Sequence, residues 1–216
     1  MTQADSGIRG YCTLILAHGA GAPMDSDFMN QLADILAQFG VTVVRFEFPY
    51  MSQRRKDGKK RPPNRTPQLI ECFEAVIADI DAMPTLPKPL MVGGKSMGGR
   101  MASMLAANER VKGVCCFGYP FHPPGKPEKL AARVTHLRTV EKPVKIFQGT
   151  RDPFGKPDHL SGILFSDSVQ IEWLQDGDHD LKPRIALGLT QERLLRRAAQ
   201  AVAKLFATVV NSSSVY

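Results

Sequence analysis

Residues 90–99, LMVGGKSMGG, join a short apolar run to a serine that has glycines on both sides. The run predicts a buried strand, and the residues after Ser96 predict a helix. Gly94–Gly98 matches the pattern G-x-S-x-G, in which the chain turns so tightly from strand to helix that the residues two before and two after the serine must be small. This stretch therefore predicts an α/β fold with a serine hydroxyl exposed at the end of a strand.

Strand-like runs alternate with amphipathic helical patterns along the rest of the chain, which is typical of a parallel sheet with helices on both faces. We expect about six mostly parallel strands flanked by helices, at Tyr11–Ala17, Val41–Phe46, Leu90–Gly93, Val111–Phe117, Val144–Gly149 and Val169–Leu174. The 216 residues suffice for one domain, so we expect residues 1–216 to form a single α/β domain, with 1–10 and 211–216 as frayed tails.

The glycine-rich stretch also invites a second interpretation, because Gly94-Lys95-Ser96 matches the end of the phosphate-binding pattern G-x-x-x-x-G-K-S. The first glycine of that pattern would fall on Pro89, and the residues that should cradle a phosphate are the predicted strand itself. The spacing therefore argues against a nucleotide-binding loop.

The net charge of +7 is concentrated in one segment, residues 52–65, which holds seven basic residues and a single acidic one. The segment contains one glycine, two prolines and no aromatic residue, so it is predicted to be a charged loop, not a base-stacking surface. Five of its cations could steer an acidic substrate toward a site at the same sheet edge: Arg54, Arg55, Lys59, Lys60 and Arg61. The alternative, a solvated loop that binds nothing, remains open.

A serine hydroxyl needs a base, and the base needs a carboxylate that holds its tautomer. Asp152 and His179 follow successive predicted strands, and the carboxyl ends of parallel strands meet at one edge. His159 lies in a predicted helix and is the weaker candidate for the base. Asp152 and His179 could instead only cap a turn and a helix, but together with Ser96 they are the favoured catalytic set.

An acyl-transfer site also needs backbone amides that stabilise an oxyanion. We expect these donors to be the amide of Met97, which follows the serine, and the amide of Ala20, in the glycine-rich loop 18–22 after the first strand. The alternative is a plain glycine-rich turn in which His18 has a structural role.

Taken together, these stretches resemble the α/β-hydrolase superfamily, and within it a small group related to a testis-expressed protein and to dienelactone hydrolases. The resemblance rests on LAHGAGAPMDS (16–26), FEFPY (46–50), KKRPP (59–63), GGKSMGGR (93–100), QGTRDPFG (148–155) and DGDHDLKPR (176–184). It implies a serine hydrolase with Ser96 as nucleophile, Asp152 as acid and His179 as base. Only residues 118–143 separate two strands where many relatives insert a cap domain, so we expect a minimal sheet, no cap and an open site.

The sequence thus predicts hydrolysis of a small carboxylic ester or thioester, without a metal or organic cofactor. If the basic segment steers substrates, the preferred substrate is acidic. A weakly active scaffold that binds a partner through residues 52–65 is the alternative, and a polyanion binder is a third hypothesis. The first ten residues lack a secretory signal, no apolar run is long enough to span a membrane, and four cysteines show no C-x-x-C spacing. These features predict a cytoplasmic location. They leave the oligomeric state open.

Overall fold

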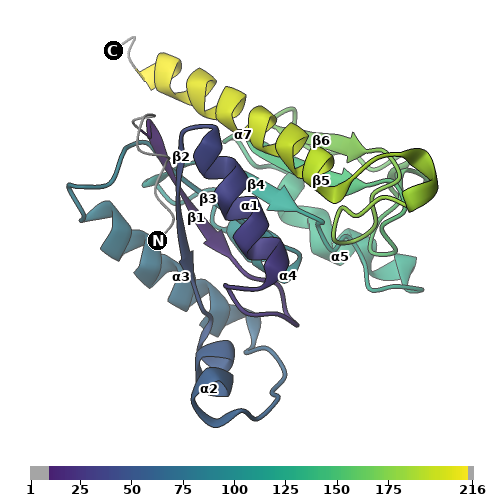
Figure 1. Cartoon of the computed structure of the whole chain (residues 1–216), viewed down its shortest axis with the longest axis horizontal. Coiled ribbons are helices and arrows are strands. Elements are labelled where there is room, and N and C mark those ends of the chain that lie inside the picture. The colour runs from purple at the N-terminus through teal and green to yellow at the C-terminus, as the bar shows by residue number, and fades with distance from the viewer. Residues whose placement is uncertain (1–9, 214–216) are drawn as a thin grey trace.

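Six parallel strands form one sheet in the computed structural model, which describes residues 10–213. The order across the sheet is β2-β1-β3-β4-β5-β6 (Figure 1). The strands are β1 (Cys12–Ala17), β2 (Val41–Phe46), β3 (Leu90–Lys95), β4 (Val111–Phe117), β5 (Val144–Gly149) and β6 (Val169–Leu174). The six predicted strands are therefore confirmed, and the main difference is that β3 extends to the residue before Ser96.

Helices cover both faces of this sheet, as the alternating pattern predicts. The helices are α1 (Asp27–Gln38), α2 (Pro49–Asp57), α3 (Thr66–Asp81), α4 (Met97–Met104), α5 (Leu130–Val134), α6 (Pro157–Leu160) and α7 (Gln191–Ser213), with short 3₁₀ turns η1 (Pro127–Lys129), η2 (Thr135–Arg138) and η3 (Ile185–Leu187). Helices α1 and α7 pack on one face, and α3, α4 and α5 pack on the other (Figure 1). Side chains of β1 alternate between the two layers, Leu14 with the first and Ile15 with the second.

The strand order reverses between β1 and β3, which are neighbours in the sheet. The register pairs Ala17 with Gly94, so the loop after β1 and the turn after β3 leave the sheet side by side. In open parallel sheets this reversal, at the carboxyl ends of the strands, is where ligands bind. The topology thus brings the loop 18–22 next to Ser96.

The basic segment is only in part the loop that its composition predicts, since residues 52–57 are helical and residues 58–65 have no regular structure. The helical part belongs to α2, which has Pro49 in its first turn and is capped at its C-terminal end by Gly58, a residue with φ +72°. Arg54, Arg55 and Lys56 occupy the last turn, where cations interact favourably with the helix dipole. Only Tyr50 and Met51 of this helix are buried, so it has no apolar stripe by which sequence periodicity could reveal it.

Two other expectations concern the segment between β4 and β5 and the end of the chain. Residues 118–143 contain only η1, α5 and η2, so the expectation of no separate cap is confirmed for this segment. Helix α7 extends to Ser213 and so includes residues 211–213 of the predicted tail, and fraying at this end stays a prediction. The predicted tails at 1–9 and 214–216 lie outside the described residues. Within residues 10–213, no helix combines the length and apolar character needed to cross a membrane.

Candidate active site

Ser96 sits at the turn between β3 and α4 in a strained conformation, with φ +51° and ψ −115°. Its amide donates to the carbonyl of Phe117 at 3.0 Å. A Cβ at position 94 would lie 2.7 Å from the carbonyl oxygen of Ala17, and a Cβ at position 98 would lie 2.6 Å from the same oxygen. Only glycine fits at these two positions, which is the constraint that the sequence pattern implies.

The structure brings the three predicted catalytic side chains together in one hydrogen-bonded chain. His179 Nε2 lies 2.9 Å from Ser96 Oγ, and His179 Nδ1 lies 2.8 Å from Asp152 Oδ2. The carboxylate of Asp152 is an acceptor, so Nδ1 carries the proton and Nε2 is left to accept from the serine hydroxyl. His159, the weaker candidate, lies on α6 and contacts His122 at 2.7 Å instead.

Asp152 is fully buried and its carboxylate is held by several donors. Gln148 Nε2 donates to Oδ2 at 2.9 Å, and the amide of Phe154 donates to Oδ1 at 2.8 Å. The ring of Phe154 stacks on the ring of His179, with centroids 4.2 Å apart. The carboxylate and the imidazole are therefore both fixed in orientation, while the His179 side chain keeps 23% of its surface exposed.

The loop that carries His179 is anchored by Asp176, a residue with φ +58° that the sequence analysis did not single out. Arg184 donates to the Asp176 carboxylate through Nε at 2.9 Å and through its amide at 2.7 Å. Arg151 Nε donates to the backbone carbonyl of Asp176 at 2.8 Å and lies 3.0 Å from Oδ1. The hydrogen bond from Arg184 is the largest cause that holds the pKa of Asp176 below its ordinary value. Its partners Arg151 and Arg184 are 25 and 8 residues away in the chain, so no local sequence pattern marks this anchor.

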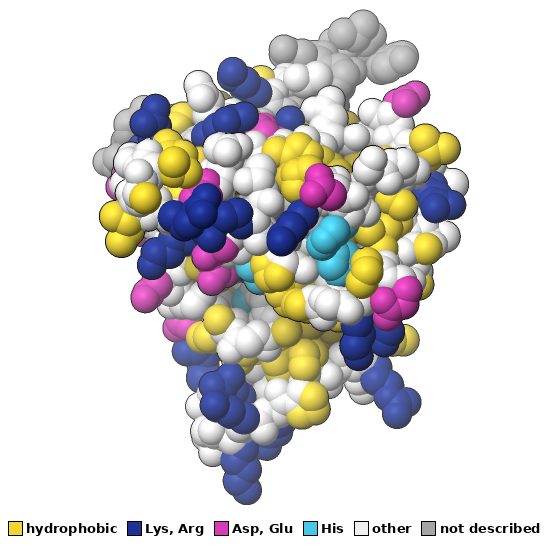
Figure 2. All heavy atoms as spheres, turned by 90° about the vertical axis from the view of Figure 1, so that its right-hand side faces the viewer, with side chains coloured by type: hydrophobic (Ala, Val, Ile, Leu, Met, Phe, Trp, Pro, Cys, Tyr) yellow, Lys and Arg dark blue, Asp and Glu magenta, His cyan; other side chains and the backbone are white. Residues whose placement is uncertain are grey.

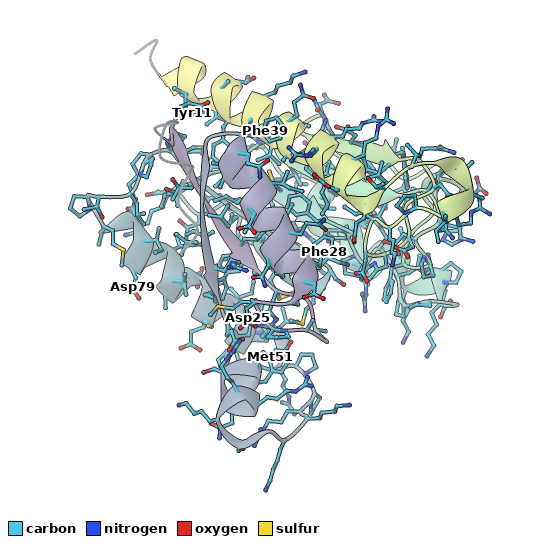
Figure 3. All side chains as sticks on the ribbon, viewed as in Figure 1. Tyr11, Asp25, Phe28, Phe39, Met51 and Asp79 are labelled. Carbon is cyan, nitrogen blue, oxygen red and sulfur yellow. The ribbon has the colours of Figure 1, made fainter. Side chains whose placement is uncertain are left out.

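Lys95, the residue before the serine, is a second residue that sequence reasoning missed. Its side chain is 8% exposed, and Nζ donates to the carbonyl of His179 at 2.7 Å and lies 3.2 Å from Asp180 Oδ1. The ammonium also lies 5.4 Å from the ring centre of Phe28, which Figure 3 places at the N-terminal end of α1. Burial lowers the pKa of Lys95, while Asp180 opposes that shift. The lysine links the serine turn directly to the histidine loop.

The loop 18–22 lies against the serine. A Cβ on Gly19 would be 3.7 Å from Ser96 Cβ. His18 is fully buried, donates from Nδ1 to the carbonyl of Gly19 at 2.7 Å and accepts from the amide of Phe48 at 3.1 Å. Burial lowers the pKa of His18, in keeping with a neutral ring that donates and accepts. The structural role that the alternative interpretation gave to His18 is therefore present, and it also orients the loop.

The two predicted oxyanion donors are the residues that follow Gly19 and Ser96, namely Ala20 and Met97. Ala20 is exposed in the loop, and the hydroxyl of Tyr50 donates to its carbonyl at 2.9 Å and, at 3.3 Å, to that of Gly19. Met97 is the first residue of α4, where a backbone amide has no acceptor within the helix. Both amides remain predictions as oxyanion donors.

The five predicted steering residues are not equivalent. Arg55 forms ion pairs with Asp25, at 2.8 Å, and with Glu47, and Arg61 forms one with Asp57. Figure 3 shows Asp25 near the base of α2, where Met51 also lies, and Figure 2 shows the basic side chains on the narrow lower projection of the molecule. Arg54 reaches the carbonyl of Gly21 at 3.5 Å, whereas Lys59 and Lys60 are exposed. Of these cations, Arg54 is therefore the one that the structure brings to the loop 18–22.

Across residues 10–213 there is no group of three or more His, Cys, Asp and Glu side chains arranged to hold a metal ion. The cysteines are free, and Cys12, Cys115 and Cys116 are buried in the sheet.

Comparison with known proteins agrees with this fold. A family model described as an alpha/beta hydrolase domain matches residues 11–207. Three similar solved structures are a dienelactone hydrolase from Anabaena variabilis (TM-score 0.68, 19% identity, 95% of this chain and 88% of that chain), an α/β serine hydrolase without a lid from Xanthomonas campestris (0.66, 18%, 92% and 86%) and the esterase domain of a Rhodothermus marinus protein (0.64, 15%, 94% and 88%). At these identities the likeness shows the fold alone.

Proposed function

The chain belongs to the α/β-hydrolase family, and from this premise we propose that it is a serine hydrolase that cleaves a small carboxylic ester or thioester through an acyl-enzyme on Ser96. The observation that carries the proposal is the continuous chain from Asp152 through His179 to Ser96, with contacts of 2.8 and 2.9 Å. Such a chain activates a hydroxyl that is otherwise a weak nucleophile. Esterases and hydrolases among the similar structures support the reaction class.

In the first half of the proposed reaction, Ser96 Oγ attacks the substrate carbonyl and His179 Nε2 takes the hydroxyl proton. Asp152 stabilises the imidazolium that forms, and the amides of Ala20 and Met97 donate to the oxyanion. When the tetrahedral intermediate collapses, the bond to the alkoxide or thiolate breaks and His179 returns the proton to that leaving group. The acyl group remains on Ser96.

In the second half, a water molecule attacks the acyl-enzyme while His179 Nε2 accepts its proton. Collapse of the second intermediate breaks the bond between the acyl carbon and Ser96 Oγ, and the proton on His179 passes to that oxygen. The products are a carboxylic acid and an alcohol or thiol, and the enzyme is regenerated.

Labelling with a fluorophosphonate probe tests the proposal, because the probe reacts with activated serines. We expect one adduct, on Ser96 by peptide mass spectrometry, that Ser96→Ala and His179→Ala abolish. Ser161→Ala, at an exposed serine, and His159→Ala, at a histidine that does not touch Ser96, are the matched controls and should keep full labelling. A folded wild-type protein that is not labelled would overturn the proposal and favour the interaction-module alternative through residues 52–65.

We also propose a cytoplasmic location, which the free and mostly buried thiols support, since free cysteines persist in reducing compartments. Fractionation of cells that express the full chain with an epitope tag tests this. Recovery in the membrane or secreted fraction would contradict it.

A further inference from the structure

Two arginines lie close together beside the proposed active site with no carboxylate to balance them. Arg100 is on α4 and Arg133 is on α5, and both are half-buried. Burial, and then the charge of Arg100, lowers the pKa of Arg133, so the two guanidinium groups are near enough to repel each other. Within residues 10–213, neither arginine forms an ion pair with an acidic residue.

Arg100 also has an unsatisfied donor. Its Nε is buried and has no hydrogen-bond partner in the part of the chain that the structure describes. Buried donors of folded proteins are nearly always paired, so an exception calls for an explanation. The other clustered cations of this chain are satisfied: Arg55 is paired with Asp25 and Glu47, and Arg184 with Asp176.

The groups around the two arginines are neutral. His136 Nε2 lies 2.8 Å from Ser103 Oγ, which itself donates to the carbonyl of Arg100. Burial, with a smaller contribution from Arg100, lowers the pKa of His136 to about 4, so this ring is uncharged at pH 7. Tyr119 is fully buried and donates from its hydroxyl to the carbonyl of Arg133 at 3.0 Å. The local field is therefore positive, since no carboxylate in residues 10–213 forms an ion pair with either arginine.

The pair is connected to the catalytic residues on both sides. The amide of Arg100 donates to the carbonyl of Ser96 at 3.0 Å, so Arg100 lies one helical turn after the serine. Long side chains on a helix lean toward its N-terminus, which here is the end that carries Ser96. Arg133 Nη1 donates to the carbonyl of Pro120 at 3.1 Å, and Gly118, two residues before Pro120, is so close to His179 that a Cβ there would lie 3.4 Å from His179 Nδ1.

We propose that Arg100 and Arg133 form a binding site for a carboxylate or phosphate group of the substrate, so that the ester or thioester hydrolysed at Ser96 is an anionic one. This inference rests on the proposed function and adds the substrate class to it. Guanidinium groups bind carboxylate and phosphate oxygens with paired hydrogen bonds. An anion bound between two guanidinium groups attracts both of them and so offsets their mutual repulsion. The terminal Nη atoms of Arg100 would bind the anion, since its Nε is buried from solvent.

This site differs from the steering segment in residues 52–65. A charged projection raises the rate of encounter and loses its effect at high salt, whereas a half-buried arginine pair acts on the bound substrate. The two contributions are therefore separable by their dependence on ionic strength.

Two pairs of esters test the proposal, with the anion on the acyl side in one and on the leaving group in the other. The first is mono-4-nitrophenyl adipate against 4-nitrophenyl hexanoate, and the second is 7-butyryloxycoumarin-3-carboxylate against 7-butyryloxycoumarin. In at least one pair we expect wild-type kcat/KM to favour the anionic ester at 0.5 M salt. Arg100→Gln and Arg133→Gln should lower kcat/KM for that ester by about 10- to 100-fold and change the neutral ester by less than about threefold. Arg138→Gln, at an exposed arginine of η2, is the matched control and should leave both unchanged.

Several outcomes decide the proposal. Equal kcat/KM for neutral and anionic esters, or a preference for the anionic ester that survives in both variants, overturns the anion site. Hydrolysis of the neutral ester in the same experiment upholds the proposed function. If no ester is hydrolysed, inorganic phosphate is titrated against Ser96→Ala protein during thermal unfolding. Phosphate that raises Tm in this protein, but not when Arg100→Gln and Arg133→Gln are added, supports an anion site independent of catalysis, and no rise in Tm overturns it. A glutamine variant that does not fold is replaced by Arg→Lys, which keeps the charge, loses the paired hydrogen bonds and should give an intermediate loss.

Discussion

The ammonium group of Lys95 donates to the backbone carbonyl of His179 at 2.7 Å, although the two residues are 84 positions apart in the chain. The same ammonium lies 3.2 Å from Asp180. One buried side chain thus ties the end of β3 to the loop after β6, which carries His179, the proposed base. Lys95 is a positioning residue in this arrangement, since it acts through His179.

Replacing Lys95 with methionine keeps a chain of similar length and removes the contacts to His179 and Asp180. We expect kcat to fall on the order of 10- to 100-fold with KM changed much less, because the base loses its position while substrate contacts remain. Steady-state kinetics on a neutral ester measures this. Lys88→Met, at an exposed lysine paired with Asp81, is the control, and an equal loss of kcat there would contradict the positioning role.

The pH dependence of the same contact gives a second test of Lys95. Burial lowers its pKa, so the ammonium loses its proton below the ordinary range of lysine, and the tie to Asp180 weakens as pH rises through that lowered value. We expect kcat to decline on the alkaline side in the wild type. Lys95→Arg, which stays protonated, should move this decline to higher pH. An identical alkaline limb in both proteins would contradict the assignment.

The glycines around Ser96 make a prediction with an internal control. In Gly98→Ala the new Cβ would lie 2.6 Å from the carbonyl oxygens of Ala17 and His18, so backbone must move. We expect the free energy of unfolding to fall by about 1 to 3 kcal/mol and fluorophosphonate labelling to be lost. Gly21→Ala, where a Cβ meets nothing within 4 Å, should leave both nearly unchanged. Chemical denaturation and labelling of the two variants provide the comparison.

The contrast between these two glycines also shows what a sequence can reveal about this site. The turn at Ser96 is predictable because its pattern is local: Gly94 and Gly98 lie two residues to either side of the serine, although the atoms that exclude a Cβ at Gly98 belong to Ala17 and His18. Asp152 and His179 are predictable because parallel strands end at one edge. The contacts of Lys95 are not predictable, since its partners His179 and Asp180 lie in a distant loop and no local pattern marks them.

Helix α2 was missed for a different physical reason. Sequence periodicity detects a helix by its apolar stripe, and α2 has only Tyr50 and Met51 buried at its start. Its remaining signals are Pro49 at the first turn, Gly58 with φ +72° at the end and cations in the last turn. Those end signals were present in the sequence, but the high density of charge favoured a loop.

His136 predicts how stability depends on pH. Its pKa in the folded protein is about 4, below the ordinary histidine value of 6.5, because burial and the charge of Arg100 oppose protonation. As pH drops from about 6.5 toward about 4, His136 is protonated in the unfolded chain but stays neutral in the folded protein, so the free energy of unfolding falls over this range. After allowance for solvent screening of this half-buried ring, we expect a contribution of about 1 kcal/mol between pH 7 and pH 5.

Urea denaturation of wild type and His136→Gln at both pH values measures this contribution. The variant should lose less stability than the wild type on going from pH 7 to pH 5. Equal losses would mean that the ring is protonated in the folded protein, which would also weaken the case for an unbalanced positive field around Arg100.

Tyr50 tests the proposed oxyanion loop without touching a catalytic side chain. Its hydroxyl donates to the carbonyls of Ala20 and Gly19, and burial raises the pKa of Tyr50 to about 12, so it remains a donor throughout the neutral range. Tyr50→Phe keeps the ring in the core and frees the loop. Loss of a direct oxyanion donor costs about 100- to 1,000-fold in kcat, so loss of a residue that only orients the donor should cost less, about tenfold, with KM unchanged. Tyr11→Phe, at an exposed tyrosine, is the control. A Tyr50→Phe enzyme with wild-type kcat would mean either that Ala20 is not an oxyanion donor or that His18 alone holds its amide in place. The variant His18→Asn separates these two cases, because it removes the ring that bridges Gly19 and Phe48.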